Sequence, residues 1–134
     1  EPLKVQNLAT GSKMFSIIKN LLEKGEINFD TMLILDEPEA HLHPEWQNAF
    51  AEIIVLVVKE FNTHVLLTTH SPNFLMAIEA YAKKYGLLDQ ANYYMATHNA
   101  DNYTVDYVCV NNNLSKIYSS FARPLVDVKQ LKDM

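Results

Sequence analysis

Two adjacent carboxylates stand where a short apolar run stops, in the segment Leu33-Ile34-Leu35-Asp36-Glu37-Pro38. Such a run is typical of a buried parallel strand, and open α/β sheets bind their ligands at the carboxyl ends of such strands. Asp36 would hold Mg²⁺ through a water molecule, because this hard cation prefers oxygen ligands. Glu37 would face an attacking water, either as a general base or to orient it. Taken alone, an acidic strand end like this is more often a turn that simply faces solvent.

A histidine follows a second apolar run, Val65 to Leu67, in the segment Thr68-Thr69-His70-Ser71-Pro72. Beside a helix start, His70 would be able to hydrogen-bond a phosphate oxygen. A lone histidine at such a place is more often a satisfied loop residue. Asp36 and His70 are 34 residues apart, the length of one crossover unit. Two parallel strands joined in this way would bring both ends close together.

Periodicity and turn residues predict the elements that hold these side chains. An apolar stripe at helical spacing predicts a helix over 12–24, with Gly25 as its left-handed C-terminal cap. Pro44 and Pro72 each open a further helix, the second with Ser71 as N-cap. The apolar runs before Asp36 and Thr68 supply the strands between these helices.

The pattern changes after Gly86. Two strands are expected over 92–96 and 103–110, followed by two short helices, one over 114–121 and one opened by Pro124. The element order α-β-α-β-α-β-β-α-α indicates an α/β fold with a mostly parallel sheet, a small β-hairpin and C-terminal helices.

Composition narrows the function classes. The 134 residues are 49% hydrophobic and 20% charged, which is typical of a globular domain, and the net charge of −5 gives no basic field for nucleic acid. The single cysteine, Cys109, fits a reducing cytosol, and no apolar run approaches a membrane span. We therefore expect a cytoplasmic protein without a membrane partner. Because the chain starts at Glu1 rather than Met, we expect it to be processed or, in preference, excised from something longer.

Glycine is scarce, and this excludes one kind of nucleotide site. The three glycines are Gly11, Gly25 and Gly86. Both G-x-x-x-x-G-K-[ST] and G-x-G-x-x-G need closely spaced glycines, so neither phosphate-binding loop is present.

The ordered motifs nevertheless resemble those of a nucleotide-hydrolysing family. L-I-L-D-E-P-E-A-H-L-H-P, from Leu33 to Pro44, resembles the Walker B motif and D-loop of ABC-type ATPases, closest to the RecF-like, OLD-like and SMC-like branch. L-T-T-H-S-P, from Leu67 to Pro72, looks like the switch histidine of that branch. Leu8-Ala9-Thr10-Gly11-Ser12-Lys13 is similar to its signature motif. The resemblance covers roughly residues 5–85 and implies the C-terminal part of a three-layer P-loop NTPase fold.

The resemblance also implies roles for individual residues. Asp36 would organise Mg²⁺, Glu37 would activate the hydrolytic water, and His70 would sense the γ-phosphate of ATP. Four D-loop residues would lie at the interface of a homodimer of ATPase heads: Ala40, His41, Leu42 and His43. Three signature residues would face the ATP of the partner subunit: Thr10, Gly11 and Ser12.

Two departures from the family pattern limit the resemblance. The serine usual after the signature leucine is Ala9, so either Thr10 supplies the hydroxyl or the contact is weakened. The phosphate loop and its lysine, which lie N-terminal to these motifs in the family, are missing. We therefore interpret residues 1–134 as a partial ABC-type ATPase domain and expect no ATP turnover from this chain alone.

Other interpretations of the same residues remain open. His41, His43, His70 and Asp36 would suit a transition-metal site, although the D-loop resemblance already explains that stretch. Six tyrosines would suit a nucleic-acid stacking platform, but core and sheet-face packing is favoured: Tyr81, Tyr85, Tyr93, Tyr94, Tyr103 and Tyr107.

Trp46 is expected in the core or as an anchor for the D-loop. The metal-binding acidic domain of an OLD-type nuclease is absent, because residues 86–134 contain no D-x-D.

Two hypotheses follow. The first is an ATPase that works with ATP and Mg²⁺ in a dimer, acting on DNA or a partner effector in DNA repair or anti-phage defence. The alternative is a catalytically silent, ATPase-like interaction module, which fits the missing phosphate loop. The ATPase hypothesis requires that Asp36 and His70 lie close together at one edge of the sheet.

Overall fold

The chain divides into two units, and each is described by itself. A computed structural model describes residues 10–99 and 104–132, and the division falls between Leu88 and Asp89. The interpretation of residues 1–134 as one partial ATPase domain stays a prediction. The candidate site lies entirely in the first unit.

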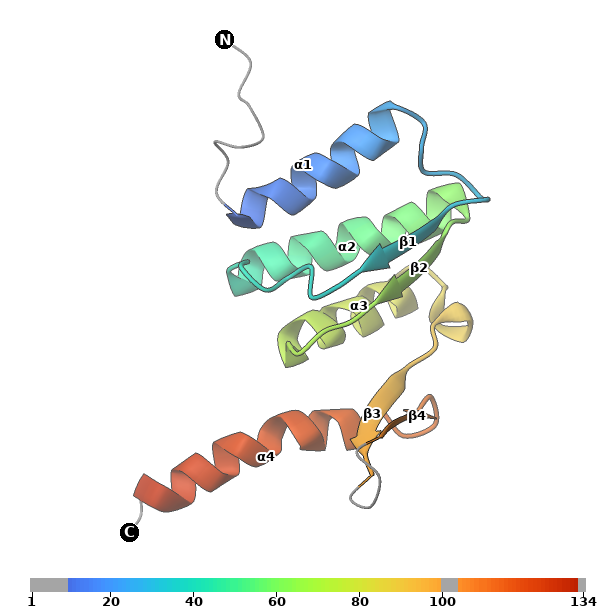
Figure 1. Cartoon of the computed structure of the whole chain (residues 1–134). Helices are drawn as coiled ribbons and strands as arrows, with labels where there is room; N and C mark the ends of the chain where they lie inside the picture. The colour runs from blue at the N-terminus through green and yellow to red at the C-terminus, as the bar shows by residue number, and fades with distance from the viewer. Residues whose placement is uncertain (1–9, 100–103, 133–134) are drawn as a thin grey trace. The chain divides into compact units, whose positions relative to one another are not determined.

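The first unit alternates helices and strands. Its elements are α1 (Thr10–Glu23), β1 (Met32–Leu35), α2 (Pro44–Phe61), β2 (His64–Leu67) and α3 (Pro72–Lys84), and a short 3₁₀ helix η2 (Leu88–Gln90) follows at the division. Strands β1 and β2 run side by side in the same direction (Figure 1), with Leu33 opposite Val65 and Leu35 opposite Leu67. The crossover through α2 that joins them is the one that the sequence predicts.

Turn chemistry sets the helix ends as expected. After α1, Gly25 takes a φ of 67°, and its N–H and that of Glu26 bond back to the carbonyls of Leu22 and Leu21 at 3.0 Å each. This paired cap is the left-handed arrangement that glycine favours. Helix α3 begins at Pro72, and the Ser71 hydroxyl accepts the N–H of Phe74 at 3.1 Å. Both predicted caps are confirmed.

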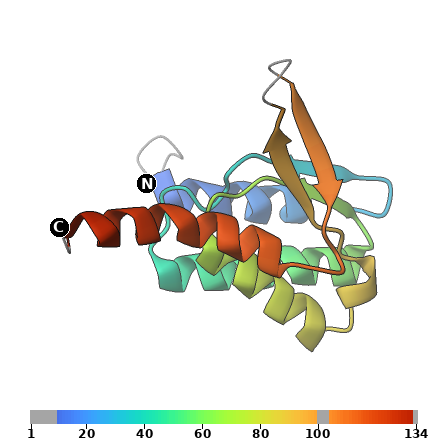
Figure 2. The same ribbon diagram turned by 90° about the horizontal axis from the view of Figure 1, so that it is seen from below.

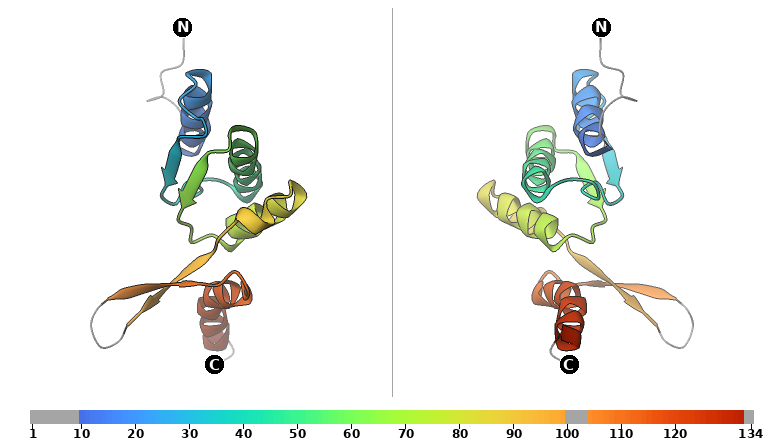
Figure 3. Two further views of the ribbon diagram at one scale, coloured as in Figure 1. Left: turned by 90° about the vertical axis from the view of Figure 1, so that its right-hand side faces the viewer. Right: turned by 90° about the vertical axis from the view of Figure 1, so that its left-hand side faces the viewer.

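The core of the first unit lies between the strands and the helices. Ten buried side chains form it: Ile18, Ile27, Leu33, Leu35, Phe50, Ala51, Ile54, Val57, Phe74 and Ala77. The Phe50 ring is fully buried between Phe15 and Phe74, with ring centroids 5.0 and 6.2 Å away. Figure 3 shows α2 and α3 on one side of the strand pair.

The other side of this sheet is open, which corrects the expectation of a strand covered on both faces. Met32, Ile34 and Leu66 point away from the core and are 58%, 70% and 50% exposed. The continuous apolar run predicts burial of both faces, and the structure shows it for one. The described residues cover only the face of Leu33 and Leu35, so they form two layers rather than three.

Helices α2 and α3 are also linked by a polar cluster. The Lys84 ammonium donates to Glu52 Oε1 at 2.9 Å, and the Tyr85 hydroxyl donates to the same oxygen at 2.5 Å. The hydrogen bond from Lys84 and then that from Tyr85 lower the pKa of Glu52, and the bond to Glu52 is the main cause that raises the pKa of Lys84. The Lys84 ammonium also lies 4.9 Å from the centre of the Tyr85 ring.

The second unit contains a hairpin and a helix. Strands β3 (Tyr94–His98) and β4 (Val105–Cys109) pair antiparallel, with Ala96 opposite Tyr107, and form a twisted ribbon (Figure 2). Tyr94 and Tyr107 are 58% and 74% exposed. Of the residues that the sequence assigned to this hairpin, 100–103, including Tyr103, lie outside the described part of the chain.

A single helix, α4 (Ser115–Lys132), follows the hairpin, so the prediction of two short helices is wrong. Pro124 lies inside α4 rather than at the start of a separate helix. Proline removes one backbone donor and crowds the preceding turn, but it does not always stop a helix whose apolar pattern continues. In the described ranges, no helix is both long and apolar enough to cross a membrane.

Candidate functional site

The candidate site forms where β1 and β2 end side by side. The register places Leu35 opposite Leu67, and the Thr68 N–H continues the ladder to the Leu35 carbonyl at 3.0 Å. Asp36 and Glu37 follow one strand directly, and Thr68 to His70 follow the other. The two chemistry-bearing segments of the sequence therefore meet at one edge of a parallel sheet.

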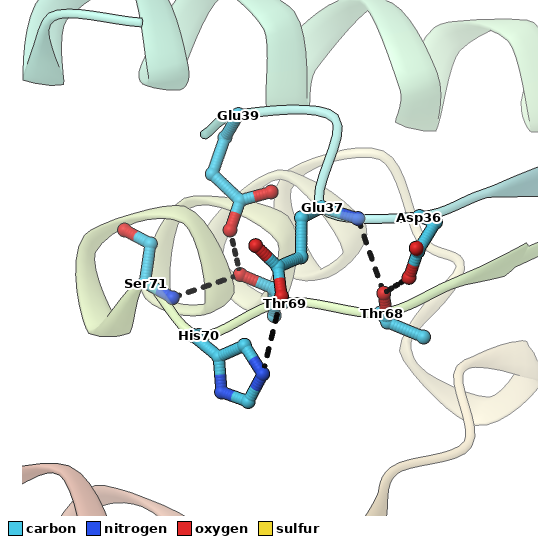
Figure 4. A network of polar contacts seen from close by, with 7 residues as sticks. All are labelled: Asp36, Glu37, Glu39, Thr68, Thr69, His70 and Ser71. Carbon is cyan, nitrogen blue, oxygen red and sulfur yellow. Dashed lines mark hydrogen bonds and ion pairs between the residues drawn. The ribbon is translucent and has the colours of Figure 1, made fainter. Parts of the chain in front are cut away.

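Thr68 joins the two strand ends through a single hydroxyl. Thr68 Oγ1 donates to Asp36 Oδ1 at 2.5 Å and accepts the N–H of Glu37 at 3.1 Å (Figure 4). The first bond orients the Asp36 carboxylate, and the second fixes the backbone of Glu37. This one side chain holds both acidic residues in place.

Glu37 and His70 contact each other directly. His70 Nε2 lies 3.2 Å from Glu37 Oε1, and the two side chains are 83% and 46% exposed. At this exposure the attraction is weak, about 0–1 kcal/mol. The imidazole is thus held loosely enough to leave the carboxylate for another partner.

The backbone of Glu37 has an unusual conformation. Its φ is 41°, in the left-handed region, where among the described residues Asn62 is the other non-glycine residue. Residues that are neither glycine nor Asn/Asp adopt this region at a cost, and such residues cluster at functional sites. The sharp turn directs the chain from β1 into the segment Pro38 to His43.

That segment lines a groove beside the site. Ala40 N–H bonds to the Glu37 carbonyl at 3.0 Å, and Ala40, His41 and His43 are exposed, whereas Leu42 packs partly against the core. The groove, of about 530 Å³, is lined by Lys13, Met14, Ile17, Asp36, Glu37, Pro38, Ala40 and His41. It brings the first turns of α1, including the Lys13 cation, beside the two carboxylates.

The signature residues begin α1, but their side chains lie outside the described part of the chain. Thr10 is the first residue of the helix, and Gly11 and Ser12 follow in its first turn. Leu8 and Ala9 precede the described residues. The predicted contact of Thr10, Gly11 and Ser12 with the ATP of a partner subunit therefore stays a prediction.

The donor set at the strand ends suits magnesium better than a transition metal. In the part of the chain that the structure describes, no three His, Cys, Asp or Glu side chains lie together to share a metal ion, which leaves His41 and His43 without such a site. Mg²⁺ is commonly held by one or two carboxylates together with substrate phosphates and waters. Asp36 Oδ1 accepts from Thr68, and Oδ2 would be left for a metal-bound water, so the residues fit this cation.

Two hydrogen bonds at the site come from threonines to which the sequence pattern assigned no role. Thr68 binds Asp36, and the Thr69 hydroxyl donates to Glu39 Oε1. A usable signal was present, because aligning D-E-P-E with T-T-H as ends of neighbouring parallel strands already places Thr68 opposite Asp36. Trp46 is a further correction: it is 58% exposed and touches Phe15 edge-on, so it is not a core residue.

Comparison with known proteins now identifies the fold. A protein-family model described as "AAA domain, putative AbiEii toxin, Type IV TA system" matches residues 12–77, just under half of the chain. A solved structure described as "Structural biochemistry of ATP-driven dimerization and DNA stimulated activation of SMC ATPases" is similar, with a TM-score of 0.58 and 12% sequence identity over 90% of this chain. The chain has a P-loop ATPase-like fold. No curated protein matches it.

The region matched by the family model contains the acidic residues and the histidine of the candidate site. Residues 12–77 include Asp36, Glu37 and His70. The chain spans 66% of the length of the similar SMC ATPase structure, so about a third of that structure has no counterpart here. The α/β class expected from the sequence is confirmed, while the parallel sheet among the described residues consists of β1 and β2.

Proposed function

We propose that this chain is the lobe of an ABC-type ATPase that contributes Asp36, Glu37 and His70 to Mg²⁺-dependent hydrolysis of ATP in a dimer of such heads. The observation that carries the proposal is the meeting of both motif segments at one sheet edge. Thr68 bridges the two acidic residues, and His70 rests on the carboxylate of Glu37 at 3.2 Å.

Each residue has a part that suits its geometry. Glu37 lines the groove and is half exposed, so its carboxylate can take the proton of an attacking water. His70 would leave Glu37 and hydrogen-bond a terminal phosphate oxygen when ATP binds, which frees the base at that moment. Asp36 would hold Mg²⁺ through a water, and the cation when bound would offset phosphate charge.

The open sheet face supports the need for a second lobe. Met32, Ile34 and Leu66 form an apolar surface, and parallel sheets are normally covered on both faces. A lobe that packs there would also bring the phosphate loop that the three glycines of this chain cannot form. The dimer would then place Ala40, His41, Leu42 and His43 at the head interface and Thr10, Gly11 and Ser12 beside the ATP of the partner subunit.

The biological setting that we propose is less specific than the residue roles. The motif form supports the RecF-like and OLD-like branch, whose usual settings are DNA repair and anti-phage defence. The matched family model names a toxin of a type IV TA system, which favours defence. The net charge of −5 favours a protein effector over direct DNA binding by this lobe.

The test is ATP hydrolysis by the whole gene product that contains this chain. We expect Glu37→Gln to reduce turnover by about 10²–10⁴-fold, the usual share of a general base, while ATP binding is retained. Glu45→Gln, an exposed change in the first turn of α2, is the matched control and should leave turnover unchanged. The present chain alone should hydrolyse no ATP.

Two results would contradict the proposal. Turnover that survives Glu37→Gln unchanged would remove Glu37 as the base. A whole gene product that neither binds nor hydrolyses ATP would favour the interaction module, for which the open apolar face of β1 and β2 would serve assembly.

A further inference from the structure

Three consecutive residues after β2 contact three different carboxylates. Thr68 donates to Asp36, His70 contacts Glu37, and Thr69 donates to Glu39. The carboxylate of Glu39 differs from the other two because Glu39 is buried, at 3% exposed. Its role is therefore not to meet a ligand from solvent.

Burial of the Glu39 carboxylate costs free energy, so its presence at this position indicates a role other than stability. A buried carboxylate is stabilised only as far as its oxygens are hydrogen-bonded. Glu39 Oε1 accepts from the Thr69 hydroxyl, whereas Oε2 has no hydrogen-bond partner in the structure. A sequence selected for stability alone would favour an apolar side chain here.

The Glu39–Thr69 contact is one link of a closed ring of hydrogen bonds. Thr69 Oγ1 accepts the N–H of Ser71 at 3.0 Å, and the Ser71 hydroxyl donates to Gln47 Oε1 at 2.8 Å. Gln47 Nε2 donates to the Leu42 carbonyl at 3.1 Å. The Leu42 N–H then returns to the Glu39 carbonyl at 2.9 Å. The ring joins the turn after β1 to the loop after β2 through the first turns of α2.

His70 lies between two members of this ring. Thr69 and Ser71 flank it, so its backbone is held on both sides, while its imidazole projects away toward Glu37 (Figure 4). A displacement of the turn 39–42 would pull on Thr69 through Glu39 and on Ser71 through Gln47. Either path moves the backbone that carries the imidazole.

We propose that Glu39, Thr69 and Gln47 are positioning residues that hold His70 against Glu37 and transmit movement of the turn 39–42 to His70. The proposal rests on the proposed function for the roles of His70 and Glu37. The ring itself is a property of this chain and can be tested without nucleotide.

The first experiment measures amide hydrogen exchange and the His70 imidazole signals by NMR on this chain. Thr69→Val removes the hydroxyl at nearly constant shape. We expect it to speed exchange at both Ser71 and Leu42 by at least about tenfold, the effect of losing one hydrogen bond to a charged group, and to shift the imidazole signals. Thr63→Val is the matched control, because Thr63 is buried, donates to the Thr31 carbonyl at 2.6 Å and lies outside the ring.

Two variants of Glu39 separate the ring from simple packing. Glu39→Gln keeps an acceptor for Thr69 and should leave Leu42 and His70 as in the parent chain. Glu39→Leu removes the acceptor and should reproduce Thr69→Val. Gln47→Leu opens the ring from the opposite side and should speed exchange at the same amides, so the test stands if one variant does not fold.

The outcomes are decisive in both directions. Exchange that changes at Ser71 but not at Leu42 would overturn the coupling, as would equal effects of Glu39→Gln and Glu39→Leu. In the whole gene product, Thr69→Val should lower kcat for ATP without changing KM. If hydrogen exchange at Ser71 and Leu42 does not change together, the positioning role of the ring is refuted. If the whole gene product has no ATPase activity, the proposed function is refuted, but the ring is not.

Discussion

The left-handed backbone of Glu37 predicts an unusual stability order among its variants. Glu37→Ala and Glu37→Gly both remove the carboxylate and its contact with His70, so their difference isolates the backbone. The N–H of residue 37 still donates to Thr68 in both variants. A side chain in the left-handed region costs about 1–2 kcal/mol, and glycine gives back about 0.5–1 kcal/mol through its larger unfolded-state entropy. The glycine variant should therefore be more stable, by up to about 1.5 kcal/mol.

Urea unfolding followed by tryptophan fluorescence suits this measurement. Trp46 is the single tryptophan, and it lies in α2 of the first unit, so its signal reports on the unit that contains Glu37. Glu45 provides the control, because it lies in the helix α2. There the order should reverse, and Glu45→Gly should be less stable than Glu45→Ala by about 0.5–1 kcal/mol. A Glu37→Gly variant no more stable than Glu37→Ala would refute the claim that this backbone is strained.

Further predictions concern the core, the last helix and the polar cluster between α2 and α3. Phe50→Ala should lower the free energy of unfolding by about 3–5 kcal/mol, measured in urea, because the ring is fully buried. Pro124→Ala should increase the helical signal in circular dichroism, because it restores a backbone donor inside α4. Glu52 has a pKa below its ordinary 4.5, so its stabilising effect is present above that pH and is lost as the pH falls through the lower folded value. Glu52→Gln should therefore lower Tm at neutral pH, and the difference from the parent chain should vanish in acid. A Tm difference that is the same at every pH would contradict this prediction.

The sequence predicts that the two strand ends meet, because the signals for this are local. Asp36 and His70 each follow an apolar run, and the crossover length brings parallel strand ends together, as the pairing of Leu35 with Leu67 bears out. The caps at Gly25 and Ser71 depend only on neighbouring residues, and they too are predicted correctly.

The errors concern what a local pattern cannot report. An apolar run indicates that both faces of a strand suit burial. It does not show which segment covers each face, so it does not predict the exposure of Ile34. Pro124 looked like a helix start because the periodicity does not show whether the preceding helix has ended. The position proposed for Glu39 depends on its contact with Thr69, which is 30 residues away in sequence and reaches Glu39 only in the fold.

The open sheet also affects how readily copies of this chain associate in solution. Among the described residues, β1 and β2 pair only with each other, so each has an outer edge with unpaired backbone groups next to an apolar face. Such an edge is a template on which strands of other molecules can add. Repulsion from the net charge of −5 opposes that addition and weakens as salt is raised. The purified chain should thus stay monodisperse when it is dilute and at low ionic strength, and it should associate more as salt is added.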